Sequence, residues 1–219
     1  MGRRGNAVQS PTTTTHSTGP GSGAARRKRK PVVRKLDRWG VQVPTLCGPL
    51  VTVRPLKKTD AALLDTILRD TRVTRFLPFR VRHESGVQFV ARVLQEQRRG
   101  DGVAFVILKT GSEELVGQMR LMNWSRLERQ AEIGYFLRRR WWGHGFASEA
   151  AKLVCRFGFR SMDLYRIRAS VVAGNDASDR VLAKAGFRWE GTARGAARLA
   201  SGWRDTHEYG LLEPDFPGT

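Results

Sequence analysis

The stretch that decides the fold is Arg140-Trp141-Trp142-Gly143-His144-Gly145-Phe146-Ala147-Ser148-Glu149. It lies between an apolar segment typical of a strand, Ala131 to Leu137, and the segment Ala147 to Arg160, whose apolar residues recur at helical spacing. Glycine permits a tight turn and a close approach to a ligand, and the free N–H groups at the start of a helix attract anions. The stretch therefore predicts a phosphate-binding bend, although Gly-x-Gly alone is equally compatible with an ordinary strand-to-helix loop.

Two common nucleotide-binding patterns do not fit this bend. The P-loop needs four residues between its glycines and a Gly-Lys-Ser/Thr ending, and both are absent. The Rossmann pattern needs a third glycine where Ser148 stands, and an acid at the end of the next strand. Asp163 has roughly the right separation of about 20 residues, but it precedes that strand instead of ending it. A dinucleotide is therefore a poor candidate for the ligand.

Outside the bend, the hydrophobic pattern alternates between the periods of helices and strands. Before it, the pattern predicts a strand at Leu50–Arg54 closed by Pro55, a helix from Ala61 to Leu68 capped by Thr59 and Asp60, and a helix that begins with a capping box at Ser85–Gln88 and stops at Gly100. The other expected elements are strands at Val103–Lys109, Leu115–Met122, Gln130–Leu137, Arg166–Val172, Phe187–Arg194 and Thr206–Leu212, and a short helix at Ala177–Lys184 ended by Gly186.

The composition is that of one globular domain preceded by a basic extension. Thr12 to Thr15, Gly19 to Gly23 and Arg26 to Lys30 offer almost no apolar residues at any period, so we expect residues 1–46 to be disordered, with the folded domain at 47–219. Their ten basic side chains against the single acid Asp37 supply +9 of the formal net charge of +19. Such charge favours polyanions such as RNA or ribosomes, unless it serves solubility alone.

Membrane insertion and a disulfide framework are not expected. No apolar run approaches the roughly 18 residues needed to cross a bilayer, and no apolar segment typical of a secretory signal follows the basic start. An Arg-rich, acid-poor start also resembles an organelle transit peptide, although a basic bacterial tail or a start codon placed too early is the better interpretation. Cys47 and Cys155 indicate neither a disulfide framework nor a metal site, so we predict no metal and a reducing, cytoplasmic setting.

A family resemblance becomes specific at the bend. Arg140-x-x-Gly143-x-Gly145 matches the Arg/Gln-x-x-Gly-x-Gly/Ala signature of GNAT acetyltransferases, whose loop binds the pyrophosphate of coenzyme A. The RimJ/RimL branch, which includes acetyltransferases of ribosomal-protein N-termini, is similar over roughly residues 49–212. The motifs that carry this similarity are Ala131-Glu132-Ile133-Gly134-Tyr135, Asn175-Asp176-Ala177-Ser178, Arg180-Val181-Leu182, Lys184-Ala185-Gly186-Phe187, Glu190-Gly191 and Trp203-Arg204-Asp205.

The resemblance implies a mixed α/β GNAT fold. Its central sheet would have about seven mostly antiparallel strands, splayed in the middle, with helices on both faces. Acetyl-CoA would enter between the strand ending at Leu137 and the strand Arg166–Val172, without a metal. The residues that the resemblance assigns to cofactor binding are Phe136, Leu137, Arg138, Arg139, Arg140, Trp141, Trp142, Gly143, His144, Gly145, Asn175 and Arg180. Asn175 is also a candidate helix cap.

The resemblance also supplies candidates for proton transfer. Ser178 matches the serine proposed as proton donor in RimL-like enzymes, and helix capping is its structural alternative. The branch can carry a glutamate a few residues after Glu190-Gly191, but Ala197 stands there. Glu132 is the substitute base, acting through water, with an ion pair as its structural alternative. Further candidates on the last strand are Asp205, His207 and Tyr209.

The expected activity is transfer of an acetyl group from acetyl-CoA to a primary amine. An α-amine with a pKa near 7.7–8.0 needs less help from a base than a lysine near 10.4, which favours a protein N-terminus, as in a ribosomal protein. The alternatives are acetylation of an aminoglycoside, an amino acid or a polyamine, and a non-catalytic acyl-CoA-binding or RNA-associated protein. The basic extension would favour ribosome or RNA association, and the chain would be a monomer or a homodimer.

Overall fold

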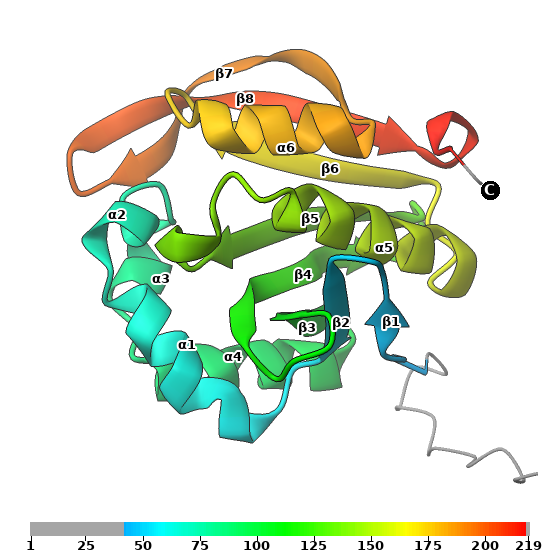
Figure 1. Cartoon of the computed structure of the whole chain (residues 1–219). Coiled ribbons are helices and arrows are strands. Elements are labelled where there is room, and N and C mark those ends of the chain that lie inside the picture. Colours follow the sequence, from blue (N-terminus) through cyan, green and yellow to red (C-terminus); the bar gives the residue numbers. More distant parts are fainter. Residues whose placement is uncertain (1–41, 218–219) are drawn as a thin grey trace, which may run out of the picture. The chain divides into compact units, whose positions relative to one another are not determined.

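The computed structural model describes residues 42–217 and builds them around one eight-stranded sheet (Figure 1). The strands lie in the order β1-β2-β3-β4-β5-β6-β8-β7, and all neighbours are antiparallel except β5 and β6. The strands are β1 (Leu46–Cys47), β2 (Val51–Pro55), β3 (Val103–Lys109), β4 (Leu115–Ser125), β5 (Gln130–Leu137), β6 (Arg166–Val172), β7 (Arg188–Leu199) and β8 (Gly202–Leu212). The α-helices are α1 (Ala61–Leu68), α2 (Thr71–Thr74), α3 (Phe79–Arg82), α4 (Gly86–Arg99), α5 (Phe146–Ser161) and α6 (Asp176–Ala185).

Helices cover both faces of the sheet, as predicted. On one face α5 buries its apolar side against the sheet, where Phe157 meets Phe105 of β3 edge to face at 5.6 Å. On the other face α1 and α4 enclose a second apolar cluster, in which Phe89 of α4 meets Phe136 of β5 at 5.5 Å. Because side chains alternate along a strand, even-numbered residues of β5 face α4 and odd-numbered residues face the side of α5 and α6.

Several local signals in the sequence act as predicted. The Ser85 side chain accepts a hydrogen bond from the Gln88 amide, and the Gln88 side chain accepts one from the Ser85 amide, so the capping box of α4 is complete. Gly100 and Gly186 end α4 and α6 in the left-handed conformation, with φ of 86° and 99°.

Other expectations were wrong in detail. Asp60 does not cap α1 through its side chain, because its carboxylate binds the Arg54 guanidinium at 2.7 and 2.9 Å and the Lys57 amide at 2.7 Å. The short helices α2 and α3 were not anticipated. The sheet has eight strands, in keeping with the expected number of about seven; the additional strand is formed by Leu46 and Cys47, which pair with β2. The last hairpin is longer than predicted, since β7 continues to Leu199 and β8 begins at Gly202.

The sheet is splayed in its middle, as predicted. β5 and β6 pair only from Gln130 to Glu132, opposite Arg166 to Arg168. Beyond these residues the strands diverge, so the rest of β5 presents an open edge. This parallel junction is the one place where the two halves of the described sheet separate.

The predicted basic extension falls mostly outside the described residues, and its boundary at residue 46 stays a prediction. Leu46, assigned to the extension, pairs with Val53 in the sheet. Residues 42–217 contain no helix long and apolar enough to cross a membrane. Both cysteines are free, with Cys47 exposed and Cys155 buried in α5, where burial raises the pKa of the Cys155 thiol.

Candidate functional site

A cavity of about 360 Å³ lies where β5 and β6 diverge. Glu132 to Leu137 of β5 line it on one side, and Ala169 to Val172 of β6 on the other. The bend before α5, the first turns of α6 and the segment around α2 complete its wall. Because consecutive residues of β5 line it, the cavity reaches both faces of the sheet.

The bend at the end of the cavity leaves backbone N–H groups free. Gly143 and Gly145 have φ of 81° and 80°, which side-chain-bearing residues rarely adopt. Gly145 is the N-cap of α5 and offers no side-chain cap. Within residues 42–217 no group accepts a hydrogen bond from the amides of Gly143, His144 or Gly145. These amides and the positive end of α5 form a place where an anion is favoured.

Trp141 and Trp142 shape the start of the bend, and both line the cavity. Their amides donate to the carbonyl groups of Arg138 and Arg139 in a short 3-10 turn. The Trp142 indole donates to the Leu137 carbonyl at 3.0 Å, so this carbonyl at the end of β5 already has a partner. A ligand pairing with β5 would therefore use the open edge before this carbonyl.

On the opposite wall, α6 contributes Asn175, Ser178 and Arg180. The Asn175 side chain accepts from the Ser178 amide and thus caps α6, so its structural role is confirmed while it also lines the cavity. Arg180 is exposed, and the structure shows it at the wall of the cavity, where a phosphate could reach it.

Four residues predicted to bind the cofactor do not line this cavity. The side chains of Arg138, Arg139 and Arg140 line a separate cavity of about 250 Å³ instead. Arg138 donates to Thr66 of α1 at 2.8 Å, Arg139 lies 3.9 Å from Asp70, and Arg140 pairs with Glu114. The His144 ring stacks on Phe146, with its Nδ1 atom 2.8 Å from the Trp142 carbonyl oxygen.

Ser178 lies in the first turn of α6 with its hydroxyl oxygen accepting from the Asn175 amide nitrogen at 3.1 Å. The hydroxyl hydrogen remains available for donation. Its neighbour Tyr135 was missed as a candidate: its hydroxyl donates to the Ser178 carbonyl at 3.4 Å, and burial raises its pKa. The alternation of β5 could have placed Tyr135 beside α6, but not shown that the strand edge opens there.

Glu132 faces the opposite side of the sheet, toward α4, and lines the cavity. It accepts a hydrogen bond from the Asn123 side chain at 3.0 Å. Within the described residues no ion pair joins it to a cation, although its charge acts on the nearby Arg120. The remaining base candidates do not line the cavity. Asp205 accepts from the Gly195 amide, and His207 and Tyr209 both contact Asp179. Burial of the Tyr209 hydroxyl, together with its hydrogen bond to Asp179, raises the pKa of Tyr209 to about 12.

Comparison with known proteins gives one family. A family model described as an acetyltransferase (GNAT) domain matches residues 51–188. The chain is 31% identical over 176 residues to YoaA, an uncharacterized N-acetyltransferase of Bacillus subtilis, covering 78% of this chain and 98% of that protein. It is 29% identical over 139 residues to the [ribosomal protein uS5]-alanine N-acetyltransferase of Escherichia coli, covering 62% of this chain and 72% of that protein.

Solved structures agree with this match. RimJ of Mycobacterium smegmatis, in complex with CoA-disulfide, gives a TM-score of 0.71 at 28% identity, covering 82% of this chain and 90% of that chain. The family model spans more than half of the present chain, and the divergence of β5 and β6 lies inside the matched region. On these grounds the chain belongs to the GNAT family of N-acetyltransferases, with RimJ-like enzymes among its relatives.

Proposed function

We propose that this GNAT enzyme moves the acetyl group of acetyl-CoA to the α-amine of a protein N-terminus. The observation that carries the proposal is the cavity at the splay, which reaches both faces of the sheet. Its Ser178 side lies against α6 and its Glu132 side faces α4. A thioester arriving on one face can therefore meet an amine arriving on the other.

The residues present fit coenzyme A as the acetyl donor. The three free amides of Gly143, His144 and Gly145 and the start of α5 are suited to its pyrophosphate. Gly143 and Gly145 have no side chain that could block the approach of the phosphates to these amides. The open edge of β5 from Ile133 to Phe136 offers backbone groups to the pantetheine arm. Arg180 and Lys184 of α6 line the same cavity and add positive charge for phosphates.

The chemistry needs one proton removed and one supplied. The amine nitrogen forms a bond to the thioester carbonyl carbon, and the bond from that carbon to sulfur breaks. The proton lost by the amine passes through water to Glu132. The leaving sulfur takes a proton from the Ser178 hydroxyl, which is restored by a proton from solvent water. The hydrogen bond from Asn175 to the Ser178 oxygen orients that hydroxyl toward donation.

A protein N-terminus is the acceptor that demands least of this site. Glu132 is one base with a single hydrogen-bonding neighbour, and an α-amine near pKa 7.7–8.0 is already partly neutral at pH 7. The similarity to an enzyme named for acetylating an alanine of a ribosomal protein points the same way. Ribosome or RNA association through residues 1–46 and a monomeric or dimeric state are further parts of this proposal that lie outside the described contacts.

The test measures release of free thiol from acetyl-CoA with three kinds of acceptor. We expect turnover with peptides that copy ribosomal-protein N-termini, and much less with polyamines, aminoglycosides or free amino acids. Mass spectrometry then locates the acetyl group on the α-amine. Preference for a small amine would mean that the acceptor is a small molecule and not a protein N-terminus. CoA binding without turnover on any amine would refute the transferase activity.

A further inference from the structure

A second cavity, of about 440 Å³, adjoins the Glu132 side of the site. We call this side the acceptor side, because the proposed reaction brings the acceptor amine to Glu132. The second cavity lies between α4 and the second half of β4, and the pocket at the splay shares Pro78 and Met122 with it. An acceptor chain whose amine reaches Glu132 can therefore continue into this space. Nothing in the proposed transfer reaction uses it.

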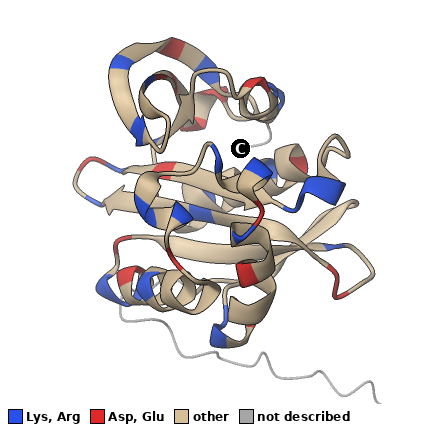
Figure 2. Cartoon of the chain, turned by 90° about the vertical axis from the view of Figure 1, so that its left-hand side faces the viewer, with Lys and Arg blue, Asp and Glu red and all other residues tan. Residues whose placement is uncertain are grey.

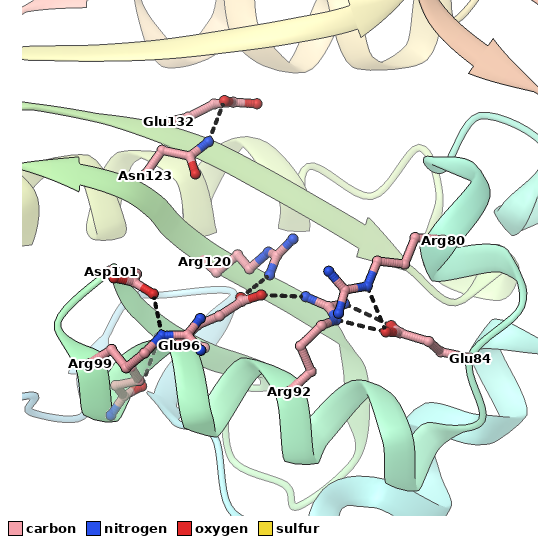
Figure 3. A network of polar contacts seen from close by, with 11 residues as sticks. Arg80, Glu84, Arg92, Glu96, Arg99, Asp101, Arg120, Asn123 and Glu132 are labelled. Carbon is pink, nitrogen blue, oxygen red and sulfur yellow. Dashed lines mark hydrogen bonds and ion pairs between the residues drawn. The ribbon is translucent and has the colours of Figure 1, made fainter.

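The wall of this second cavity holds a network of arginines and glutamates (Figure 3). All three nitrogens of the Arg92 guanidinium donate: two bind the Glu84 oxygens at 2.7 Å and one binds Glu96 at 2.9 Å. Arg120 of β4 makes one hydrogen bond, to the second Glu96 oxygen at 3.1 Å. A guanidinium has five N–H donors, so most donors of Arg120 lack a protein partner among the described residues.

Three arginines of the network, Arg80, Arg92 and Arg120, form ion pairs with only two carboxylates, Glu84 and Glu96. The charge of Glu132 also attracts Arg120, but the two side chains form no ion pair within the described residues. Arg120 is 14% exposed, and its burial lowers the pKa of the guanidinium. A buried guanidinium with spare donors beside open space is stabilised by a bound carboxylate, which can accept two of its N–H groups.

The register of the sheet places Arg120 next to the candidate base. Arg120 pairs with Gly134 across the β4–β5 ladder, and Met122 pairs with Glu132. Arg120 and Glu132 are therefore diagonal neighbours on one face, with Cα atoms about 7–8 Å apart. Figure 3 shows Arg120 between the Asn123–Glu132 pair and Glu96 of α4.

The mouth of the acceptor side is also basic. Arg72 of α2 and its C-cap Arg75 line the pocket at the splay, where Glu132 is the one acidic residue of the described wall. Figure 2, viewed from the end that carries α2, shows Lys and Arg segments on both the helices and the long hairpin. This charge disfavours a polycationic acceptor and favours one that carries negative charge beyond its amine.

We propose that Arg120 is a carboxylate-binding subsite that selects acceptors with an acidic side chain close to the amine. The inference rests on the proposed transfer to N-terminal amines. Consecutive Cα atoms lie 3.8 Å apart, so a peptide whose amine is at Glu132 brings its second or third side chain to Arg120. The α-carboxylate of a free amino acid is too close to its own amine to span the same two groups.

The test compares two peptides that differ only in Asp or Asn at the second residue. We expect kcat/KM to favour the Asp peptide about tenfold or more in the wild-type enzyme, as a charge-assisted pair provides. Arg120→Met should bring this ratio close to one, and Arg120→Lys should retain part of it. The ratio is measured within each variant, so a lower folded fraction does not alter it.

Arg99→Met is the matched control, because Arg99 lines the same cavity but is exposed and pairs with Asp101 at 2.9 Å. This variant should keep the ratio. Turnover without a preference for Asp, or a preference that survives Arg120→Met, would overturn the subsite and leave the transferase intact. Faster acetylation of free aspartate than of either peptide would overturn the peptide assignment.

The same two peptides are also titrated into the enzyme with CoA present. Tighter binding of the Asp peptide that Arg120→Met abolishes supports the subsite even if neither peptide is acetylated, and then only the transferase activity is refuted. Equal binding of both peptides, without turnover, would refute the two proposals together.

Discussion

Two neighbouring side chains can supply the proton that the leaving thiol needs. The Ser178 hydroxyl accepts from Asn175 and is free to donate, whereas the Tyr135 hydroxyl is directed to the Ser178 carbonyl. We expect Ser178→Ala to lower kcat about 100-fold, as loss of a general acid does, with CoA affinity unchanged. Steady-state kinetics and calorimetric titration of CoA measure the two effects separately.

Tyr135→Phe serves as the comparison, because it removes the other hydroxyl and keeps the ring that lines the cavity. Tyr135→Phe should lower kcat much less than Ser178→Ala does. If Tyr135→Phe is the slower variant and Ser178→Ala retains full activity, the donor is the tyrosine and the assignment of Ser178 is wrong.

Glu132 is tested through the pH dependence of its replacement. Glu132→Gln keeps a side chain that can bond to Asn123 but cannot take the proton of the amine. As the pH rises through 7.7–8.0, more of an N-terminal amine is neutral without help. The deficit of the variant in kcat/KM should therefore be largest near pH 6 and shrink above pH 8. A deficit that is constant across this range would mean that Glu132 only positions the acceptor.

Among the elements, the bend before α5 is the one that we propose binds the pyrophosphate of the cofactor. A Cβ at Gly143 meets no atom within 4 Å, so Gly143→Ala costs only the backbone strain of a positive φ, about 1–2 kcal/mol. We expect the strained bend to turn its free amides away from the pyrophosphate and to weaken CoA binding at least tenfold, as measured by calorimetry.

Gly111→Ala is the matched control for this effect. Gly111 has φ of 76° and open space around it, but it does not line the cavity. The control should lose similar stability to heat and keep the affinity for CoA. Equal affinity in both variants would show that the bend does not hold the pyrophosphate.

The junction of β2 and α1 depends on one buried carboxylate. The Asp60 side chain is 3% exposed; burial raises its pKa, but hydrogen bonds from Arg54 and Lys57 outweigh this, so the net pKa is lowered. Arg54→Met should therefore destabilise the protein by about 3 kcal/mol at pH 7, by leaving a buried charge unpaired. A lowered carboxyl pKa contributes stability that is lost as the pH falls through it.

The difference in stability between wild type and Arg54→Met should accordingly shrink in acid, where the pairing contributes less. Urea unfolding at pH 7 and at pH 4 measures it. A difference that grows on acidification would contradict the role assigned to this pair.

Local sequence predicted those elements whose determinants are local. The Ser85–Gln88 capping box and Gly100 set both ends of α4, and the glycine bend preceded a helix as expected. The extent of the last hairpin was not predicted because Gly195-Ala196-Ala197 has weak strand propensity. Beyond a register shift, Ala197 to Leu199 pair with β8 and continue β7. The side-chain contacts of the three arginines at the start of the bend were not predicted either. They are made with residues far away in the sequence: Thr66, Asp70 and Glu114.

At the scale of the whole folded domain, the two halves of the sheet are joined only where three residues of β5 pair with three residues of β6. A ligand in the cavity contacts β5 and the bend on one half, and β6 and α6 on the other. CoA that binds the native state alone stabilises it by about 2.7 kcal/mol at a concentration of 100 Kd. We therefore expect amide hydrogen exchange to slow on both halves at once, at Ile133–Leu137 and in the first turn of α6.

The Gly143→Ala variant is the control, since CoA at the same concentration should protect it much less. Protection confined to the bend and β5, with α6 exchanging as in the free protein, would show that the ligand does not bridge the two strands. Because β6 pairs with β8 along its full length, protection that also spreads from β6 into β8 would show that the ligand tightens that half of the sheet as a unit.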